Sequence, residues 1–198
     1  MTIIHLVRHG KTSFTGTRIA GYLAGVHLTD EGKEQADRVA CYLEYSPITA
    51  VYASPLERAM ETAAPIAEKL NLDIRQVDFL KEINFGRLQG MGEELADEPA
   101  WQIFQRTPSR AVFPEGESVV AAQMRVVAGL NWLSQIHAFS EEIVCVSHCE
   151  AIRLALAFAL QRSLENFAEI TVDTASVSKV FWEPENIRVV SINFIPRF

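Results

Sequence analysis

The chain has 198 residues, 48% of them hydrophobic and 22% charged, which is an ordinary globular composition with enough residues for one substantial core. The formal net charge of −7 argues against a nucleic-acid or anionic-membrane surface, because both need a basic stripe. The chain has no apolar run of membrane-spanning length and no even cysteine framework, and we expect no signal peptide, because the N-terminal stretch has no basic region and its apolar run is short. We therefore expect one domain over residues 1–198, located in the cytoplasm, without nucleic-acid or membrane partners.

Strand and helix patterns alternate along the chain. Strands are predicted at 2–7, 48–54, 73–83 and 142–147, with 73–83 the weakest pattern. Helices are predicted at 29–45, 55–70, 117–139 and 150–160, and Pro65 is expected to kink or end the second one early. Glycines and prolines predict loops with short helices over 86–114, and residues 176–183 and 187–194 are typical of a terminal hairpin.

This alternation predicts an α/β fold, a three-layer sandwich in which helices flank a mostly parallel central sheet. Three of the strands are nearly continuous apolar runs, as is typical of strands covered on both faces. In such folds ligands bind beyond the carboxyl ends of the strands. The terminal hairpin would leave a free sheet edge, so a homodimer paired through that edge is one expectation.

Reactive side chains follow the predicted strands. Arg8 and His9 end the first strand, and Arg58 lies in the first turn of the helix after the second. Glu82 lies near the end of 73–83, and His148 directly follows 142–147. Because the carboxyl ends of neighbouring parallel strands meet at one edge of a sheet, we expect these five side chains to converge.

These residue types suit phosphoryl transfer. Arginine presents a fixed fork of donors to phosphate oxygens, and histidine serves as nucleophile or donor near neutral pH. A carboxylic acid protonates a leaving oxygen and later accepts a proton from water. The set therefore indicates transfer through a phosphohistidine to and from a small phosphorylated substrate, without a metal or another cofactor.

Five ordered motifs carry a family resemblance. The stretches are LVRHGKT, YASPLERAMETA, LKEINFGRLQG, FPEGES and VSHCEAIR. In this order the chain resembles the histidine phosphatase superfamily, the phosphoglycerate-mutase-like proteins, and within it the phosphatase branch. The resemblance implies that His9 is the phosphorylated nucleophile and that Arg8, Arg58 and His148 clamp the transferring group. It also implies that Glu82 is first the acid that protonates the leaving alcohol and then the base that accepts a proton from the attacking water.

The resemblance further implies a set of substrate-binding positions. They are Gly10, Lys11, Thr12, Thr15, Arg18, Gly21 and Cys149. Gly10 would let the backbone pass close to the ligand, and Arg18 with Gly21 matches an R-x-x-G element that shapes the pocket.

Several positions depart from the family pattern. Lys11 replaces a common Glu or Gln, and Thr15 replaces a common Asn. Cys149 and Glu150 stand where two glycines are frequent, and together they would enlarge the pocket wall and repel a second anion on the substrate. We expect the chemistry to survive these changes, whereas the identity of the substrate stays open.

Other interpretations of the same residues remain. Lys11 could be a surface lysine, Arg18 a structural ion pair, Thr15 a turn cap and Glu82 a surface acid. Cys149 has no separate activating base in the sequence, so a place in the pocket wall is favoured over a nucleophilic role.

Trp101, Phe104 and Phe113 could form an apolar wall for the substrate, or they could only pack the 86–114 segment.

Three functions compete. A metal-independent phosphomonoesterase is favoured over a bisphosphoglycerate-dependent phosphoglycerate mutase, because the segment 88–113 is short and acidic. The third is a non-catalytic phospho-ligand binding protein, which the complete set of reactive residues disfavours. A metallohydrolase finds no support, because the sequence lacks HExxH and any His–Asp cluster with ligand spacing.

Overall fold

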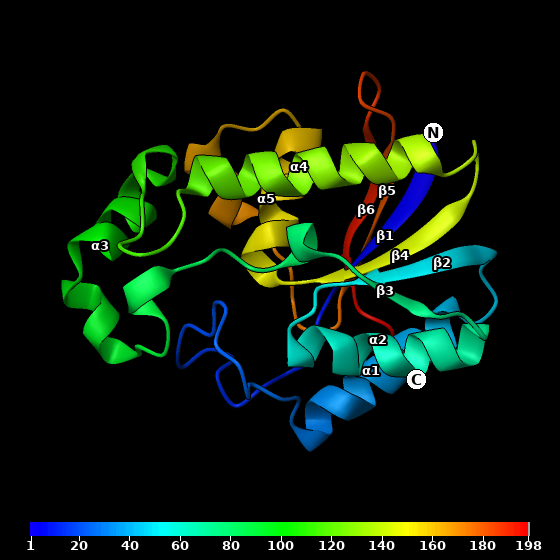
Figure 1. Cartoon of the computed structure of the whole chain (residues 1–198), viewed down its shortest axis with the longest axis horizontal. Helices are drawn as coiled ribbons and strands as arrows, with labels where there is room; N and C mark the ends of the chain where they lie inside the picture. Colours follow the sequence, from blue (N-terminus) through cyan, green and yellow to red (C-terminus); the bar gives the residue numbers. More distant parts are fainter. Residues whose placement is uncertain (198) are drawn as a thin grey trace.

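In the computed structural model, which describes residues 1–197, a six-stranded sheet lies between two layers of helices (Figure 1). Helices α1 and α2 cover one face and α4 and α5 the other, while α3 lies beyond the end of the sheet. The strands are β1 (Thr2–Arg8), β2 (Ile48–Ala53), β3 (Ile74–Gln76), β4 (Glu142–Ser147), β5 (Val177–Trp182) and β6 (Arg188–Phe194). The α-helices are α1 (Asp30–Leu43), α2 (Glu57–Leu70), α3 (Pro99–Arg106), α4 (Val119–Ile136) and α5 (Cys149–Ala159).

The strand order is β3-β2-β4-β1-β5-β6. The first four of these strands are parallel, β5 is antiparallel to β1, and β5 and β6 form the expected antiparallel hairpin. This arrangement confirms the three-layer α/β fold with a mostly parallel sheet. In the register of β1 with β4, Arg8 lies opposite Ser147, so these two strands end at the same level. The next residue, His9, still donates its N–H to the Ser147 carbonyl at 3.0 Å.

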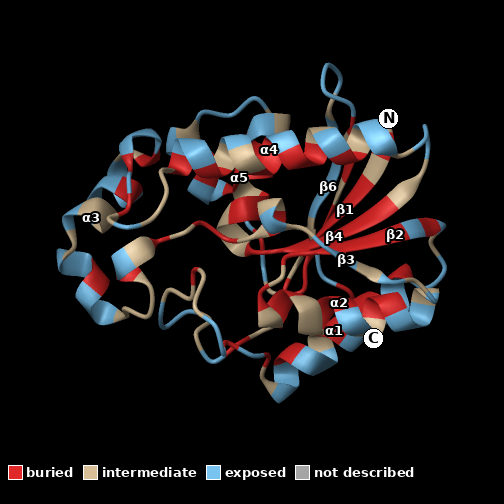
Figure 2. Ribbon diagram, viewed as in Figure 1, coloured by how far each residue is buried: buried red, intermediate tan, exposed pale blue. Residues whose placement is uncertain are grey.

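Two apolar cores hold the layers together, one on each face of the sheet (Figure 2). The core under α1 and α2 contains Val39, Val51 and Val144. The core under α4 and α5 continues past the end of the sheet into the segment around α3, where Phe104 and Phe113 are buried. Strands with apolar side chains on both faces follow from this double coverage. The sheet is therefore a rigid platform for whatever its strand ends carry.

The 73–83 segment forms much less strand than expected. Strand β3 ends at Gln76, and the chain then tightens into a 3-10 helix over Asp78–Leu80. After Val77 donates its N–H to Ala53 at 3.0 Å, the following carbonyls no longer pair with a strand: that of Phe79 accepts from Arg125, and that of Leu80 accepts from the hydroxyl of Ser147. A strand cannot continue once its carbonyls are taken in this way, so Glu82 lies on a loop.

Pro65 does not end α2, which continues to Leu70 and stops at Asn71 in a left-handed conformation. A proline inside a helix removes one hydrogen bond and costs about 3 kcal/mol. Burial of Ile66 and Ala67 in the core immediately after Pro65 offsets this cost. Tertiary packing therefore overrides the local signal. Among residues 1–197, no helix has the length and apolar character needed to cross a bilayer.

Candidate active site

One cavity opens at the carboxyl ends of β1, β2 and β4. It contains about 590 Å³ of empty space when its open mouth is included. Four of the five residues expected to carry the chemistry line it, and the fifth, His148, packs its ring against His9 at a centroid distance of 5.1 Å. The four lining residues are Arg8, His9, Arg58 and Glu82. We call these five residues the reaction centre.

The ring of His9 is held in one tautomer. Its Nδ1 lies 2.7 Å from the carbonyl oxygen of Gly10, and because a carbonyl only accepts, Nδ1 carries the proton. Burial, followed by the charges of Arg58 and Arg8, holds the pKa of His9 well below its usual value. The imidazole is therefore neutral near pH 7, with the lone pair on Nε2. Arg58 Nε donates to that lone pair at 3.3 Å.

Two guanidinium groups are fixed beside His9 without a carboxylate partner. Arg8 Nη1 donates to the carbonyl of Val172 and Arg58 Nη2 to that of Gly21, both at 2.7 Å. Arg8 Nε and Arg58 Nη1 are buried and have no hydrogen-bond partner within residues 1–197. A buried charge without a partner is costly, so this geometry is suited to an anion that enters from the cavity.

His148 is positioned by the end of β2. Its Nε2 lies 2.8 Å from Ser54 Oγ, which already accepts the N–H of Leu56 at 3.3 Å. The hydroxyl proton is then available to Nε2, so we assign the ring proton to Nδ1, which is buried and unpartnered in the described chain. Burial and the charge of Arg58 hold the pKa of His148 well below its usual value. His148 is thus a neutral donor placed beside His9.

Glu82 reaches the cavity from its loop and lies at the N-terminus of α5. Its Oε1 accepts the N–H groups of Ile83 at 3.0 Å and Ala151 at 3.1 Å. Its Oε2 accepts only the N–H of Glu150, at 3.2 Å. The three backbone donors fix the orientation of the carboxyl group, and Oε2, with one donor, has more acceptor capacity left than Oε1.

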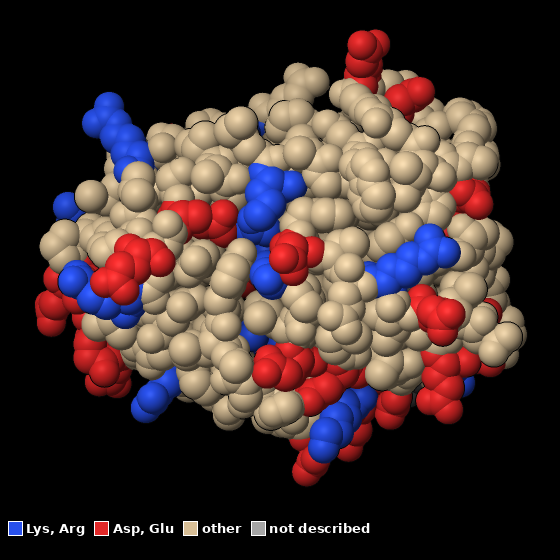
Figure 3. Space-filling model, viewed as in Figure 1, with Lys and Arg blue, Asp and Glu red and all other residues tan. Residues whose placement is uncertain are grey.

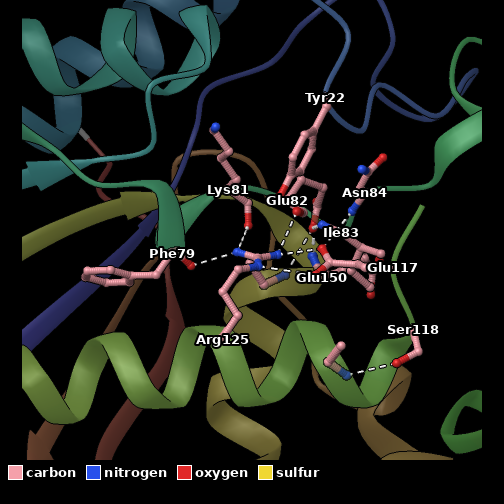
Figure 4. Close-up of polar contacts among 12 residues, drawn as sticks. Tyr22, Phe79, Lys81, Glu82, Ile83, Asn84, Glu117, Ser118, Arg125 and Glu150 are labelled. Atoms are coloured by element: carbon pink, nitrogen blue, oxygen red, sulfur yellow. Dashed lines mark hydrogen bonds and ion pairs between the residues drawn. The ribbon is translucent and has the colours of Figure 1, made fainter. Parts of the chain in front are cut away.

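A single arginine of α4 fastens the loop that carries Glu82 (Figure 4). Arg125 donates to the carbonyls of Phe79 at 2.8 Å, Lys81 at 3.0 Å and Glu82 at 3.0 Å. It also pairs with Glu117 at 2.7 Å. Sequence reasoning missed Arg125, because an arginine on an amphipathic helix is usually solvated. The only sequence feature that pointed to this arginine was its ion-pair partner Glu117, which belongs to the FPEGES motif.

Ser147 and Thr62, which were also not singled out, tie the site to the sheet. Ser147 Oγ donates to the carbonyl of Leu80 at 2.6 Å, which anchors the same loop to β4. Thr62 Oγ accepts the N–H of Gly10 at 3.0 Å and donates to the carbonyl of Arg58 at 2.7 Å. The hydroxyl therefore joins the end of β1 to helix α2.

The expected substrate-binding residues separate into two groups. Five of them line the cavity: Thr12, Thr15, Arg18, Gly21 and Cys149. Lys11 and Gly10 do not. The ammonium of Lys11 pairs with Glu31 at 2.6 Å on the surface. A Cβ at Gly10 would collide with the carbonyl of Gly32, so close packing against α1 explains this glycine.

The cavity-lining members of this set have structural partners as well. Thr15 Oγ accepts the N–H of Thr12 at 3.0 Å, so it caps a turn while facing the cavity. Gly21 has a φ of +50° and supplies the carbonyl that holds Arg58. Burial raises the pKa of the Cys149 thiol to about 12, which leaves it protonated and places it in the wall rather than among nucleophiles.

Apolar side chains form another part of the cavity. Phe14, Ile19, Phe85 and Trp101 line it, and we call these four residues the apolar wall. Of the three aromatic residues considered from the sequence, Trp101 lies in this wall. Phe104 and Phe113 are buried behind it in the core and contact Phe85 edge-on.

Charge on the exterior is mixed. On the face drawn in Figure 3, basic side chains are interleaved with acidic ones. Among residues 1–197 no group of three or more His, Cys, Asp or Glu side chains is arranged to hold a metal ion. The positive charge at the cavity therefore comes from the arginines of the reaction centre and from Arg18.

Comparison with known proteins agrees with this site. The family model of the histidine phosphatase superfamily (branch 1) matches residues 4–195. Phosphoserine phosphatase 1 of Hydrogenobacter thermophilus is 30% identical over 98% of this chain and 92% of its own length. The probable phosphoglycerate mutase GpmB of Proteus mirabilis is 30% identical over 92% of this chain and 86% of its own. The solved structure of YhfR from Bacillus stearothermophilus superposes with a TM-score of 0.91, covering 98% of each chain at 24% identity.

The chain therefore belongs to the histidine phosphatase superfamily, as its motifs indicated. Its fold is that of the family, and relatives named as phosphatases support phosphatase activity.

Proposed function

We propose that the protein is a metal-independent phosphomonoesterase that acts through a phosphohistidine at His9 on a small phosphorylated metabolite. The observation that carries the proposal is the Nδ1–H···O=C bond from His9 to Gly10, which leaves the Nε2 lone pair of a neutral ring beside two fixed guanidinium groups. A neutral, oriented imidazole is the form in which histidine acts as a nucleophile.

In the first step Nε2 attacks phosphorus, and the bond from phosphorus to the alcohol oxygen breaks. Glu82 Oε2 donates its proton to the departing oxygen, so that a neutral alcohol leaves. In the second step water attacks the phosphohistidine, and Glu82 takes up the proton that the water loses. The phosphorus–nitrogen bond then breaks, inorganic phosphate departs, and neutral His9 is restored.

The charge of the transferring group is balanced by the unpartnered donors of the site. Arg8 Nε, Arg58 Nη1 and His148 Nδ1 are each buried and free within the described chain. Fixed donors of this kind favour the developing negative charge without reorganisation. The arginines supply the positive charge that a metal ion supplies in other phosphoryl-transfer sites, so the proposed steps need no metal.

Phosphoglycerate mutase activity is the alternative with a specific observation in its favour, because a relative at 30% identity carries that name. A mutase must keep water away from its phosphohistidine while a bisphosphorylated intermediate reorients. The segment 88–113, which contributes Trp101 to the cavity, is short and acidic, with Glu93 and Glu94 in one exposed 3-10 helix. Acidic side chains there disfavour a second phosphate group, which supports the hydrolytic reaction.

Steady-state assays test the proposal. With 4-nitrophenyl phosphate and EDTA we expect sustained hydrolysis. With 3-phosphoglycerate and added 2,3-bisphosphoglycerate, we expect release of phosphate to exceed formation of 2-phosphoglycerate. Faster isomerisation than hydrolysis would assign the mutase reaction instead. Tight phosphate binding without turnover on a broad panel of phosphomonoesters would assign a binding protein.

A further inference from the structure

The exterior face of helix α4 carries almost no charge. Arg125 is the only Lys, Arg, Asp or Glu between residues 118 and 140, and it turns inward to the loop that carries Glu82. The acid just before this stretch, Glu117, is paired with the same arginine. In Figure 3 the surface over α4 is tan along most of its length. Helices at the surface of soluble proteins normally turn a charged face to water, so this face is unusual.

Apolar side chains form a straight ridge along this face. The ridge consists of exposed residues at every fourth position, namely Val120, Met124, Ala128, Trp132 and Ile136. We call these five residues the α4 ridge. Met124 is 67% exposed and Ile136 is 51% exposed. Side chains four residues apart lie one above the other, and rows of this kind are the surfaces that interdigitate when two helices pack.

Two aromatic side chains extend the apolar surface beyond the ridge. The ring of Phe79 lies so close to Gly129 that a Cβ there would meet it at 2.1 Å, and it contacts the ring of Trp132 edge-on at 6.3 Å. Phe139, just past the end of α4, is 76% exposed. Together with the ridge they leave roughly 600 Å² of apolar surface in water, at the upper end of what a monomer usually exposes.

A second copy of the chain suits this surface better than a partner of opposite charge. The surface offers no charged group for such a partner to pair with. Two copies of net charge −7 repel each other, and they approach at least cost across a face without acidic side chains. Burial of roughly 600 Å² on each copy totals about 1,200 Å², the lower limit of specific interfaces, so the expected dimer is reversible.

The ridge also has the symmetry needed to pair with itself. Its smallest member, Ala128, is at the centre, with Met124 one turn before it and Trp132 one turn after it. A two-fold axis at Ala128 makes the two helices antiparallel and sets Met124 of each copy beside the partner's Trp132. The small central side chain lets the two helix axes approach to about 8 Å, the short end of the range for packed helices.

We propose that the α4 ridge is the contact surface of a homodimer in which two α4 helices pack across a two-fold axis at Ala128. The sequence alone favours pairing through the terminal hairpin. That edge is less suitable, because the register of β6 with β5 shifts on both sides of Lys179, and irregular edges oppose strand pairing. The residues that line the cavity include no member of the α4 ridge, so the proposal does not depend on the phosphatase function.

Complementary charges at Ala128 test the proposal. In sedimentation velocity from about 1 to 200 μM, the unmodified protein should convert from monomer to dimer with a Kd on the order of 10 μM. Ala128→Glu and Ala128→Lys should each stay monomeric over this range, because like charges meet at the axis. Their equimolar mixture should regain the dimer, because opposite charges then meet there. A cooperative thermal transition in each variant checks that the fold persists.

Val190→Lys is the matched control, because Val190 is a 51% exposed apolar residue of β6, at the sheet edge. Its Kd should equal that of the unmodified protein. A monomeric unmodified protein at the highest concentration, or a mixture that stays monomeric, would overturn the proposal. Loss of the dimer in Val190→Lys but not in Ala128→Glu would also overturn it and would assign the contact to the sheet edge.

Discussion

The reaction centre and the apolar wall face one cavity but are built differently. The reaction centre lies at the ends of β1, β2 and β4 and on the loop held by α4, and each of its polar groups is fixed by a backbone carbonyl, an N–H or a hydroxyl. The apolar wall comes from the 14–19 turn and from the segment around α3, and its side chains Phe14 and Ile19 are only half-buried.

This difference suggests that the reaction centre determines the rate of the chemical step, whereas the apolar wall determines which substrate is bound. Groups at the ends of buried strands cannot move without disturbing the sheet, which suits a transition state with exact geometry. Phe14 lies on a turn outside the buried cores, so it can change at less cost to the core and can adapt a common reaction to a particular substrate. Substitutions in the two regions should therefore affect different kinetic constants.

The largest effect is expected for His9→Ala. Removing the proposed nucleophile should lower kcat by at least about 10⁴-fold, because the proposal assigns the covalent intermediate to His9 alone. Steady-state hydrolysis of 4-nitrophenyl phosphate measures the loss, and thermal unfolding checks that the fold persists. Retention of substantial activity by this variant would place the reaction elsewhere.

Glu82→Gln should lower kcat about 10²- to 10⁴-fold for alkyl phosphates, which need a proton on the leaving oxygen. Formation of the phosphoenzyme from 4-nitrophenyl phosphate should be affected far less, because nitrophenolate leaves without protonation. Pre-steady-state bursts with the two substrate types measure the difference. An equal loss for both would show that Glu82 is not the acid.

Arg125→Lys should also reduce turnover of alkyl phosphates more than that of 4-nitrophenyl phosphate, but by a smaller factor than Glu82→Gln does. Lysine keeps the charge but loses the fork that reaches three carbonyls, so the loop with Glu82 should shift. We expect kcat for alkyl phosphates to fall about tenfold, with the same dependence on the leaving group as in Glu82→Gln. A loss that does not depend on the leaving group would indicate a structural role only.

The buried histidines should make stability depend on pH. In the folded state the pKa values of His9 and His148 lie well below 6.5, so below that pH the unfolded chain binds protons that the native chain does not. The free energy of unfolding should then decrease as pH falls from 6.5. In His148→Gln the decrease should be smaller by up to about 1.4 kcal/mol per pH unit, measured by urea unfolding.

His27→Gln is a control, because the pKa of His27 is shifted in the opposite direction to those of His9 and His148. His27 is exposed, and its pKa is raised by Glu61, so its protonation adds stability at low pH. That contribution is complete below pH 6.5 and is lost as pH rises through the raised folded pKa, so replacing His27 should leave the decrease below pH 6.5 nearly unchanged and lower the free energy of unfolding of the protonated form only. A shallower decrease in this control would contradict the assignment.

The smallest effect is expected in the apolar wall. Trp101→Ala should raise KM about three- to tenfold and leave kcat nearly unchanged, because it removes contact area that is equal in the ground state and the transition state. Michaelis constants for O-phosphoserine and 4-nitrophenyl phosphate measure it. A large fall in kcat would show that the two regions are coupled.

The sequence predicted the reaction centre better than its surroundings, for a physical reason. Apolar strands that end in Arg8 and in His148 leave few ways to arrange those residues, because parallel strand ends must meet. Glu82 was expected at the end of a strand, yet it lies on a loop that long-range bonds from Arg125 and Ser147 hold in place. Such bonds leave no periodic signal in the chain.

The surface position of Lys11 was equally hard to predict, because it too depends on a contact between residues far apart in the sequence. Its neighbours in sequence line the cavity, but its partner Glu31 lies on α1, and only the folded chain brings the two together. The half-buried Glu150 could be recognised as unusual from sequence, whereas its unpaired oxygen could not.

Trapping the phosphoenzyme tests the central claim most directly. The protein is mixed with 4-nitrophenyl phosphate, quenched in alkali within milliseconds, digested and analysed by mass spectrometry. We predict one phosphate on the peptide that contains His9, stable in alkali and lost in acid, and none in His9→Ala. A burst of nitrophenolate without phosphate on His9, or a phosphate on another residue, would contradict the account.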